Sequence, residues 1–292
     1  MIYSLIKQKF GTSKLDPVFN IDLNYKIVDL CHVPDLGYIF VCEGVHALGY
    51  VDDNGSLVFP WAGNIENRGC QEGYKEYARF NMPSSLSYCK ELGVCYVIDN
   101  NGRGVRSVDV RDGYVSAISN KNRKKDFKRI LDGAFISTSS TNDTRGKVYW
   151  TISDLNKVFS IEDSEVYSLA GSGHSSFSVS NRLDKCSFNK PQGIKYTDGA
   201  IYVCDSGNKC IRRIKNGSVK IIAGSPDEKS LLGFPTRLKI KNNIGYLVDK
   251  DEIKYFSFGN SSIGTVYKSK KIIDIEISEK KDLYILEGDN EV

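Results

Sequence analysis

The chain contains 292 residues, of which 40% are hydrophobic and 26% charged, a balance that excludes a collagen, a coiled coil and a wholly disordered protein. Its 40 basic and 36 acidic side chains leave a net charge of only +4, so charge alone does not indicate nucleic acid or an anionic membrane as a partner. No apolar run approaches the roughly 18 residues of a membrane span and no signal peptide is recognisable, so we expect a soluble cytoplasmic or other intracellular protein, with a virion also compatible.

A four-residue motif, aromatic–aliphatic–any–acidic, recurs along the chain. Its copies start at Phe40, Tyr96, Tyr202, Tyr246 and Tyr284, and a copy without the acid starts at Tyr149. The intervals between these aromatic residues run from 38 to 56 residues, which is the repeat length of β-propeller blades. Six copies therefore predict six blades.

The predicted blades follow one another in chain order over the whole sequence, which we interpret as one domain, 1–292. The fourth blade shows the plan most clearly, with strands expected at 193–196, 200–205, 210–214 and 219–223. Asp198-Gly199 and Asn216-Gly217 supply two-residue hairpin turns between them, so the strands form an antiparallel meander. The expected blade ranges are 25–63, 80–118, 129–171, 188–224, 234–268, and 272–292 together with 2–7.

The sixth predicted blade is short of strands. It contains only 272–277 and 283–287, whereas the N-terminal stretch Ile2–Lys7 has no blade of its own. Since an open ring would expose unpaired sheet edges, we expect this stretch to become the outer strand of the sixth blade and to close the ring. The predicted fold class is thus all-β: a six-bladed β-propeller of four-stranded antiparallel blades.

Several segments resemble the NHL-repeat family. They are Lys190-Pro-Gln-Gly-Ile194, Ile201-Tyr-Val-Cys-Asp-Ser-Gly-Asn208, Ile211-Arg-Arg-Ile214 and Ile221-Ile-Ala-Gly224, and also the connection from Ala62-Gly63 to Ala78-Arg-Phe-Asn-Met-Pro83. The resemblance is strong over residues 60–224 and implies a six-bladed propeller. It implies no single activity, because the family includes protein-binding and RNA-binding propellers and some lyases, and related six-bladed folds include lactonases.

The acids that end the repeated motif form the most regular polar series. They could form a ring that binds a cation, as in calcium-dependent six-bladed enzymes, or each could cap its own tight turn through local backbone hydrogen bonds. Repetition in every blade favours the second interpretation, because a metal site uses unlike ligands from a few blades. The weak metal candidates are Glu43, Asp99, Asp205, Asp249 and Glu287.

The catalytic residue types are scarce. The three histidines, His32, His46 and His174, are not expected to converge, because His32 should lie at the opposite end of its blade from the other two. Neither G-x-S-x-G nor H-E-x-x-H occurs. We therefore expect a protein without catalytic residues and without a cofactor, and the alternative is an NHL-type lyase or lactonase-like enzyme with calcium at the propeller axis.

One basic run, residues 121–129, connects the second and third predicted blades. It could contact RNA phosphates, as basic faces of RNA-binding NHL propellers do, or it could be a solvated loop, which its lysine-rich composition favours. The nucleic-acid candidates are Lys121, Arg123, Lys124, Lys125, Lys128 and Arg129.

Other distinctive residues are given structural roles. Arg106, Arg212 and Arg213 are expected on blade surfaces, Trp61 and Trp150 in blade packing, and the eight cysteines as reduced and mostly buried thiols.

The leading functional hypothesis is a non-catalytic propeller that acts as a scaffold for protein–protein interaction, as a structural subunit of a larger assembly, cellular or viral. Its longest predicted loops lie on one face, and loops on a rigid frame are where recognition usually occurs. The partner-binding candidates are Tyr74, Tyr77, His174 and Phe177.

Overall fold

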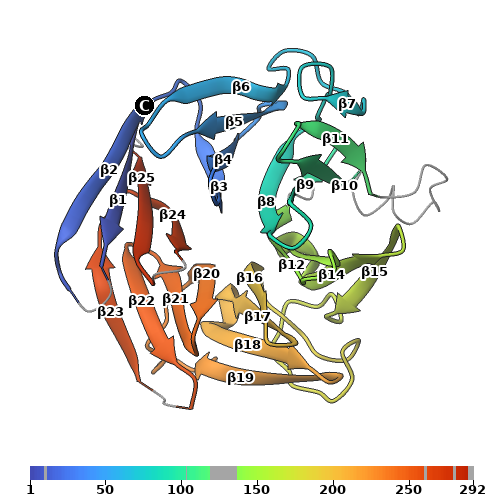
Figure 1. Cartoon of the computed structure of the whole chain (residues 1–292). Coiled ribbons are helices and arrows are strands. Elements are labelled where there is room, and N and C mark those ends of the chain that lie inside the picture. The colour runs from blue at the N-terminus through green and yellow to red at the C-terminus, as the bar shows by residue number, and fades with distance from the viewer. Residues whose placement is uncertain (10–11, 103, 119–136, 260–261, 279–280, 289–292) are drawn as a thin grey trace. The chain divides into compact units, whose positions relative to one another are not determined.

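The computed structural model describes residues 1–9, 12–102, 104–118, 137–259, 262–278 and 281–288 (Figure 1). The described residues form six antiparallel sheets of four strands each, one of which gains a two-residue fifth strand. The fold is the predicted six-bladed β-propeller. The chain divides into two compact units: Met1, 21–150 and 160–167 form unit 1, and 2–20, 151–159 and 168–292 form unit 2.

Unit 1 contains two complete blades. The first consists of β3 (Ile27–Val33), β4 (Gly37–Cys42), β5 (Ala47–Val51) and β6 (Leu57–Gly63). The second consists of β8 (Pro83–Cys89), β9 (Val94–Asp99), β10 (Gly104–Asp109) and β11 (Tyr114–Ala117), and β7 (Gly73–Tyr74) pairs with its outer strand, β11. Buried aliphatic residues of both blades, such as Val41 and Val97, share one hydrophobic cluster.

The division between the units runs through the third blade, which consists of β12 (Ser137–Asn142), β13 (Val148–Ile152), β14 (Lys157–Glu162) and β15 (Glu165–Ala170). Single-turn 3-10 helices follow the second strands of the third and fourth blades, at Ser153–Leu155 and Ser206–Asn208. No described helix is long and apolar enough to cross a membrane.

Unit 2 contains the remaining blades. The fourth is β16 (Pro191–Thr197), β17 (Ala200–Asp205), β18 (Cys210–Lys215) and β19 (Ser218–Gly224), and the fifth is β20 (Pro235–Lys241), β21 (Ile244–Asp249), β22 (Glu252–Ser257) and β23 (Ile263–Lys268). The predicted hairpins are present, and Asn216 and Gly217 have φ of 50° and 73°, the left-handed values that a two-residue turn of this kind requires.

The sixth blade combines both ends of the chain. Its strand order is β24 (Ile272–Ile277), β25 (Leu283–Gly288), β1 (Ile2–Gln8) and β2 (Leu15–Asp22). The N-terminal strand completes the last blade as predicted, but its expected position as the outer strand is wrong. It is the third strand and pairs with β25 from Tyr3 to Gln8, and β2, which the sequence analysis does not predict, lies outside it. The C-terminal segment supplies two strands to this sheet, so two N-terminal strands are needed to complete four.

The cysteines are all free thiols, seven of them buried and Cys70 partly buried. Burial raises the pKa of Cys42 and of Cys210 to about 12. Both thiols are therefore protonated at neutral pH and behave as small hydrophobic groups.

Candidate functional site

Three exposed tyrosines gather on the second blade, and we call them the tyrosine surface: Tyr74 of β7, Tyr77 of the following turn and Tyr114 of β11. Their exposed fractions are 52%, 72% and 40%. The rings of Tyr74 and Tyr114 meet edge to face, with centroids 5.3 Å apart, because β7 pairs with β11. The Tyr77 N–H donates to the Tyr74 carbonyl at 2.8 Å, which holds the turn closed.

The buried side chain of Arg106 of β10, which is 0% exposed, holds the segment that carries Tyr74 and Tyr77. Its guanidinium donates to the Arg79 carbonyl at 3.0 Å and to the Gln71 carbonyl at 2.8 Å, and it pairs with Asp99 at 3.3 Å. Both ends of segment 71–79 are thus tied to one buried cation. The predicted surface position of Arg106 is wrong, because the connection before the blade folds over its third strand and needs donors for its carbonyls.

Lys75 fixes the middle of the same segment. Its ammonium lies 5.5 Å from the Trp61 ring centre, and its carbonyl accepts the Gly63 N–H at 2.9 Å. Its side-chain methylenes cover Gly113, where a Cβ would lie 2.9 Å from Lys75 Cδ. Tyr74 and Tyr77 therefore lie on a segment that is held at both ends and in the middle.

The same anchor recurs in unit 2. Arg212 of β18 is fully buried, pairs with Asp205 at 3.0 Å, and donates to the carbonyls of Ser187 and Ser178 in the connection before its blade. Its predicted surface position is wrong for the same reason, whereas Arg213 is only partly buried.

Two of the predicted partner contacts lie in that connection. The centre of the Phe177 ring lies 5.3 Å from the Arg212 guanidinium, so Arg212 covers one face of the ring. His174 is exposed, and its backbone N–H donates to Ser172 Oγ at 3.3 Å. Tyr74 and Tyr77 belong to unit 1 and these two residues to unit 2, so the structure joins the candidates only as two separate pairs.

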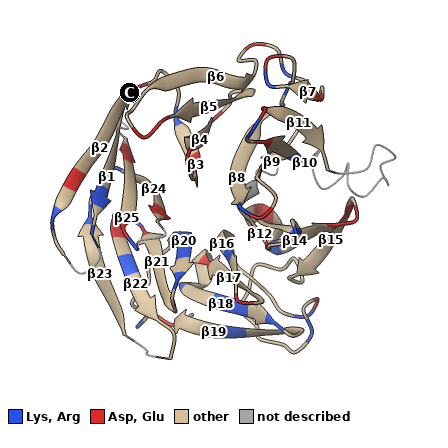
Figure 2. Cartoon of the chain, viewed as in Figure 1, with Lys and Arg blue, Asp and Glu red and all other residues tan. Residues whose placement is uncertain are grey.

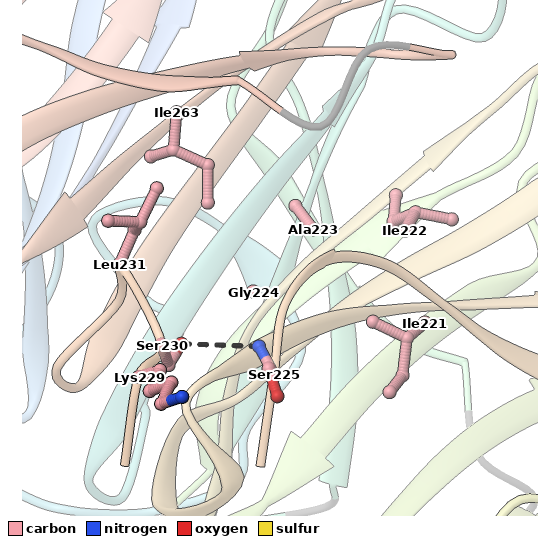
Figure 3. Close-up of a pocket in the computed structure, with 9 residues that line it drawn as sticks. All are labelled: Ile221, Ile222, Ala223, Gly224, Ser225, Lys229, Ser230, Leu231 and Ile263. Carbon is pink, nitrogen blue, oxygen red and sulfur yellow. Dashed lines mark hydrogen bonds between the residues drawn. The ribbon is translucent and has the colours of Figure 1, made fainter. Parts of the chain in front are cut away.

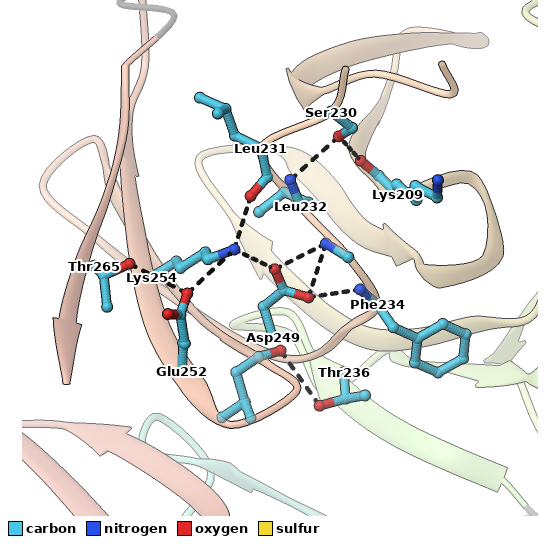
Figure 4. Close-up of polar contacts among 12 residues, drawn as sticks. Lys209, Ser230, Leu231, Leu232, Phe234, Thr236, Asp249, Glu252, Lys254 and Thr265 are labelled. Atoms are coloured by element: carbon cyan, nitrogen blue, oxygen red, sulfur yellow. Dashed lines mark hydrogen bonds and ion pairs between the residues drawn. The ribbon is translucent and has the colours of Figure 1, made fainter. Parts of the chain in front are cut away.

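The fifth blade uses lysine for the same purpose (Figure 4). Lys254 Nζ lies 2.7 Å from Asp249 and donates to the Leu231 carbonyl at 2.7 Å. The Asp249 carboxylate also accepts the N–H groups of Gly233 and Phe234. The connection before this blade is therefore held by a cation and a carboxylate together.

Three of the repeated acids thus accept backbone N–H groups from the connection that enters their blade. Asp99 accepts from Asn81 and Asp205 from Asn189, each at 2.7 Å. Their carboxylates therefore bind a connection that is distant in the sequence, and Asp205 also accepts the side-chain amide of Asn208 in the turn after its own strand at 2.9 Å. Burial raises the pKa of Asp99 to about 7, although the Asn81 N–H and Arg106 act in the opposite direction.

The other two acids differ. Glu43 is exposed and pairs with Lys26 at 2.9 Å, and Glu287 accepts the Tyr267 hydroxyl at 3.0 Å. Within the described part of the chain, no group of three or more His, Cys, Asp or Glu residues is arranged to hold a metal ion.

The histidines have different environments. His32 of β3 packs against Tyr38, with ring centres 4.8 Å apart. His46 Nδ1 accepts the Met82 N–H at 3.3 Å, and burial, followed by the charge of Arg68, lowers the pKa of His46. The basic candidates Lys121, Arg123, Lys124, Lys125, Lys128 and Arg129 lie outside the described residues.

The first strands of the blades in unit 2 carry a charged cluster that the sequence analysis does not predict (Figure 2). Lys239 of β20 pairs with Glu276 of β24 at 2.8 Å, and Arg237 Nε lies 3.6 Å from Asp274. Burial opposes ionisation of Glu276, yet Lys239 and Lys195 hold its pKa below the usual value. The sequence contains a signal for this cluster, because each of its members follows the central aliphatic residue of a first strand. These members are Lys195, Lys239 and Glu276.

The comparisons with known proteins agree with the fold. The model of the NHL repeat family matches residues 188–214, which confirms the resemblance seen in the sequence. NHL repeat-containing protein 2 of Gallus gallus is 27% identical over 215 residues, covering 68% of this chain. The chain spans only 28% of that relative's length.

Two solved structures show the same architecture. The nidogen/laminin complex contains a chain that matches with a TM-score of 0.63 and 10% identity, over 98% of both chains. A catalytically inactive virginiamycin B lyase from Staphylococcus aureus, solved with quinupristin, matches with a TM-score of 0.58 and 12% identity, over 97% of this chain and 88% of the lyase. At these identities the likeness shows the fold alone.

Proposed function

We propose that this propeller with an NHL repeat is a non-catalytic scaffold that binds another protein through the tyrosine surface, as a subunit of a larger assembly. The observation that carries the proposal is the placement of two exposed tyrosines, Tyr74 and Tyr77, on a backbone segment tied to a fully buried arginine, with the exposed Tyr114 of β11 packed against Tyr74. Tyrosine offers a large, amphipathic contact area and loses little rotamer freedom on binding. A segment that is already ordered does not have to be ordered when the partner binds.

The surroundings of the tyrosine surface fit a protein partner. Glu72, Lys75, Glu76 and Asp112 lie next to it in the sequence, so charges of both signs border the aromatic centre. An aromatic centre with a mixed polar border is the usual composition of a specific protein interface. His174 and Phe177 remain a proposed second contact, in unit 2.

The test compares tagged wild-type protein with the double variant Tyr74→Ala/Tyr77→Ala in affinity purification from the source cells, followed by quantitative mass spectrometry. We expect a stoichiometric protein partner to be lost with the double variant. The matched control is Tyr167→Ala, which removes a similarly exposed tyrosine of β15 and should retain the partner.

Binding measurements with the purified partner then give the contribution of each tyrosine to affinity. A tyrosine that dominates an interface contributes about 2 kcal/mol or more, so each single variant should raise Kd by roughly 30-fold. If both tyrosine variants keep the partner at wild-type affinity, the tyrosine surface is not the binding site.

A lyase or lactonase-like enzyme is the second candidate, and the partly exposed charged cluster around Glu276 is the observation that favours it. Tightly bound, stoichiometric calcium or zinc in the purified protein would support the enzyme over the scaffold.

RNA binding through residues 121–129 remains a third hypothesis. Charge reversal at Lys124 and Lys125 should then weaken RNA binding and reduce its salt dependence.

A further inference from the structure

A histidine of the first blade holds the start of the second blade, and both lie in unit 1. His46 lies in the turn between β4 and β5, and Met82 lies directly before β8. The ring Nδ1 of His46 accepts the backbone N–H of Met82 at 3.3 Å. Because a backbone N–H can only donate, Nδ1 must carry a lone pair, so this contact requires the neutral ring with its proton on Nε2.

Met82 has a backbone conformation that needs such support. Its φ is 64°, a left-handed value that is uncommon for a residue with a side chain, and the residue before a proline ordinarily takes an extended conformation. The neighbouring Asn81 N–H donates to the Asp99 carboxylate at 2.7 Å. Since a left-handed residue persists only while its surroundings hold it, loss of the His46 bond favours a local rearrangement of residues 80–82.

The turn that carries His46 is packed closely against the same connection, residues 64–82. A Cβ on Gly63 would lie 2.8 Å from the His46 carbonyl oxygen and 2.8 Å from the Phe80 ring. Phe80 is fully buried, and its ring centre lies 5.2 Å from the Arg106 guanidinium. The His46 ring is itself partly buried, so breaking its bond to Met82 has a cost.

The surroundings of His46 oppose a positive charge on its ring. Burial is the larger cause that lowers the pKa of His46, and the positive charge of Arg68 is the second. Among the described residues, no carboxylate contributes to this pKa, and Glu43 of the same turn is paired with Lys26 at 2.9 Å. The other charged residues near this junction, in the connection and the second blade, include Glu66, Glu72, Arg79, Asp99 and Arg106.

We propose that the contact between His46 and Met82 is an acid-sensitive switch between the first and second blades. Protonation of Nδ1 turns the acceptor into a donor that faces the Met82 N–H, so the hydrogen bond is lost and residues 80–82 loosen. These residues continue directly from segment 71–79, which carries Tyr74 and Tyr77. An effect of acid on partner binding rests on the proposed function, whereas the switch itself is testable in the isolated protein.

The direction of the pH dependence follows from the lowered pKa of His46. The contact is fully present above about pH 6.5 and is lost as the pH falls from there through the lowered pKa. Asp99, which is paired with Arg106, has the opposite effect, because its raised pKa favours the folded state at low pH. A variant is therefore needed to separate the two residues.

The test measures amide hydrogen exchange of residues 80–82 at pH 7.5 and pH 5.0, corrected for the intrinsic exchange rate at each pH. It compares the wild type with His46→Asn, in which an amide oxygen takes the place of Nδ1 and cannot titrate. Between the two pH values, protection in the wild type should fall by about threefold or more relative to His46→Asn. The matched control His174→Asn replaces an exposed histidine of unit 2 and should behave as the wild type does.

Residues 229–231 of unit 2 provide an internal reference for the same experiment. They border a pocket of about 360 Å³ that has no histidine among its described lining residues (Figure 3). At each pH, their protection should therefore be the same in all three proteins.

An NMR titration of the wild type needs no folded variant. The ring signal that is absent from His46→Asn identifies His46, and it should titrate below about pH 6.5, the ordinary value for histidine. The proposal is overturned if His46 titrates at or above that value. It is equally overturned if the protection of residues 80–82 changes with pH to the same extent in the wild type and in His46→Asn.

Discussion

Replacing Arg106 with methionine tests whether a buried ion pair holds the segment that carries the tyrosines. Methionine keeps much of the side-chain volume but removes every donor. The Asp99 carboxylate is then left buried without its cation, and the carbonyls of Arg79 and Gln71 lose their shared donor. The change therefore affects both the stability of unit 1 and the order of segment 71–79.

The magnitude follows from the burial of both partners, which are 0% exposed. Removing one partner of a buried ion pair costs about 3–5 kcal/mol, and this applies at a pH above 7, where Asp99 is ionised. At about 2–4 °C for each kcal/mol in a protein of this size, the melting temperature of the protein should fall by roughly 6–20 °C. Arg106→Lys should cost less, because Lys254 makes the equivalent contacts in the fifth blade.

The assay is denaturant unfolding followed by tryptophan fluorescence, because Trp61 and Trp150 both belong to unit 1. Trypsin cleavage after Lys75 and Arg79 reports release of the segment. The matched control is Arg111→Met, which removes an exposed arginine paired with Asp109 and should change the free energy of unfolding by less than about 0.5 kcal/mol. A loss below about 1 kcal/mol for Arg106→Met, with unchanged cleavage, would refute the anchoring role.

Two further predictions concern the sixth blade and Asp99. Deletion of residues 1–9 removes β1 from between β25 and β2 and exposes the partners of the buried Tyr3 and Leu5. The melting temperature should therefore fall by more than about 10 °C. The control Ile2→Ala, at an exposed position, should leave the melting temperature unchanged. Because the folded-state pKa of Asp99 is raised to about 7 from 3.8, its contribution to stability is fully present below pH 3.8 and is lost as the pH rises through 7. Wild-type stability relative to Asp99→Asn should therefore decline between pH 4 and pH 8, and a constant difference in unfolding free energy would contradict the raised pKa.

The blade count and the course of each blade could be predicted from the sequence because they depend on local features. Two-residue turns such as Asn216-Gly217 and the repeated aromatic–aliphatic–acidic motif involve residues adjacent in the chain. The exposure of Tyr74 and Tyr77 also agrees with a polar connection between blades. The role of β2 was not predictable in the same way, because its alternation of buried and exposed residues is clear only toward its C-terminal end.

The roles of the charged residues were decided by the tertiary structure. Arg106 and Arg212 belong to strands whose local pattern suits a solvated surface, yet each is buried by a connection whose carbonyls lie 25 to 35 residues earlier in the chain. The pairing of Lys239 with Glu276, 37 residues later, likewise requires neighbouring blades to be in place. A single sequence specifies turns and strands through short-range preferences, whereas the burial and partner of a charge depend on which distant segment packs over it.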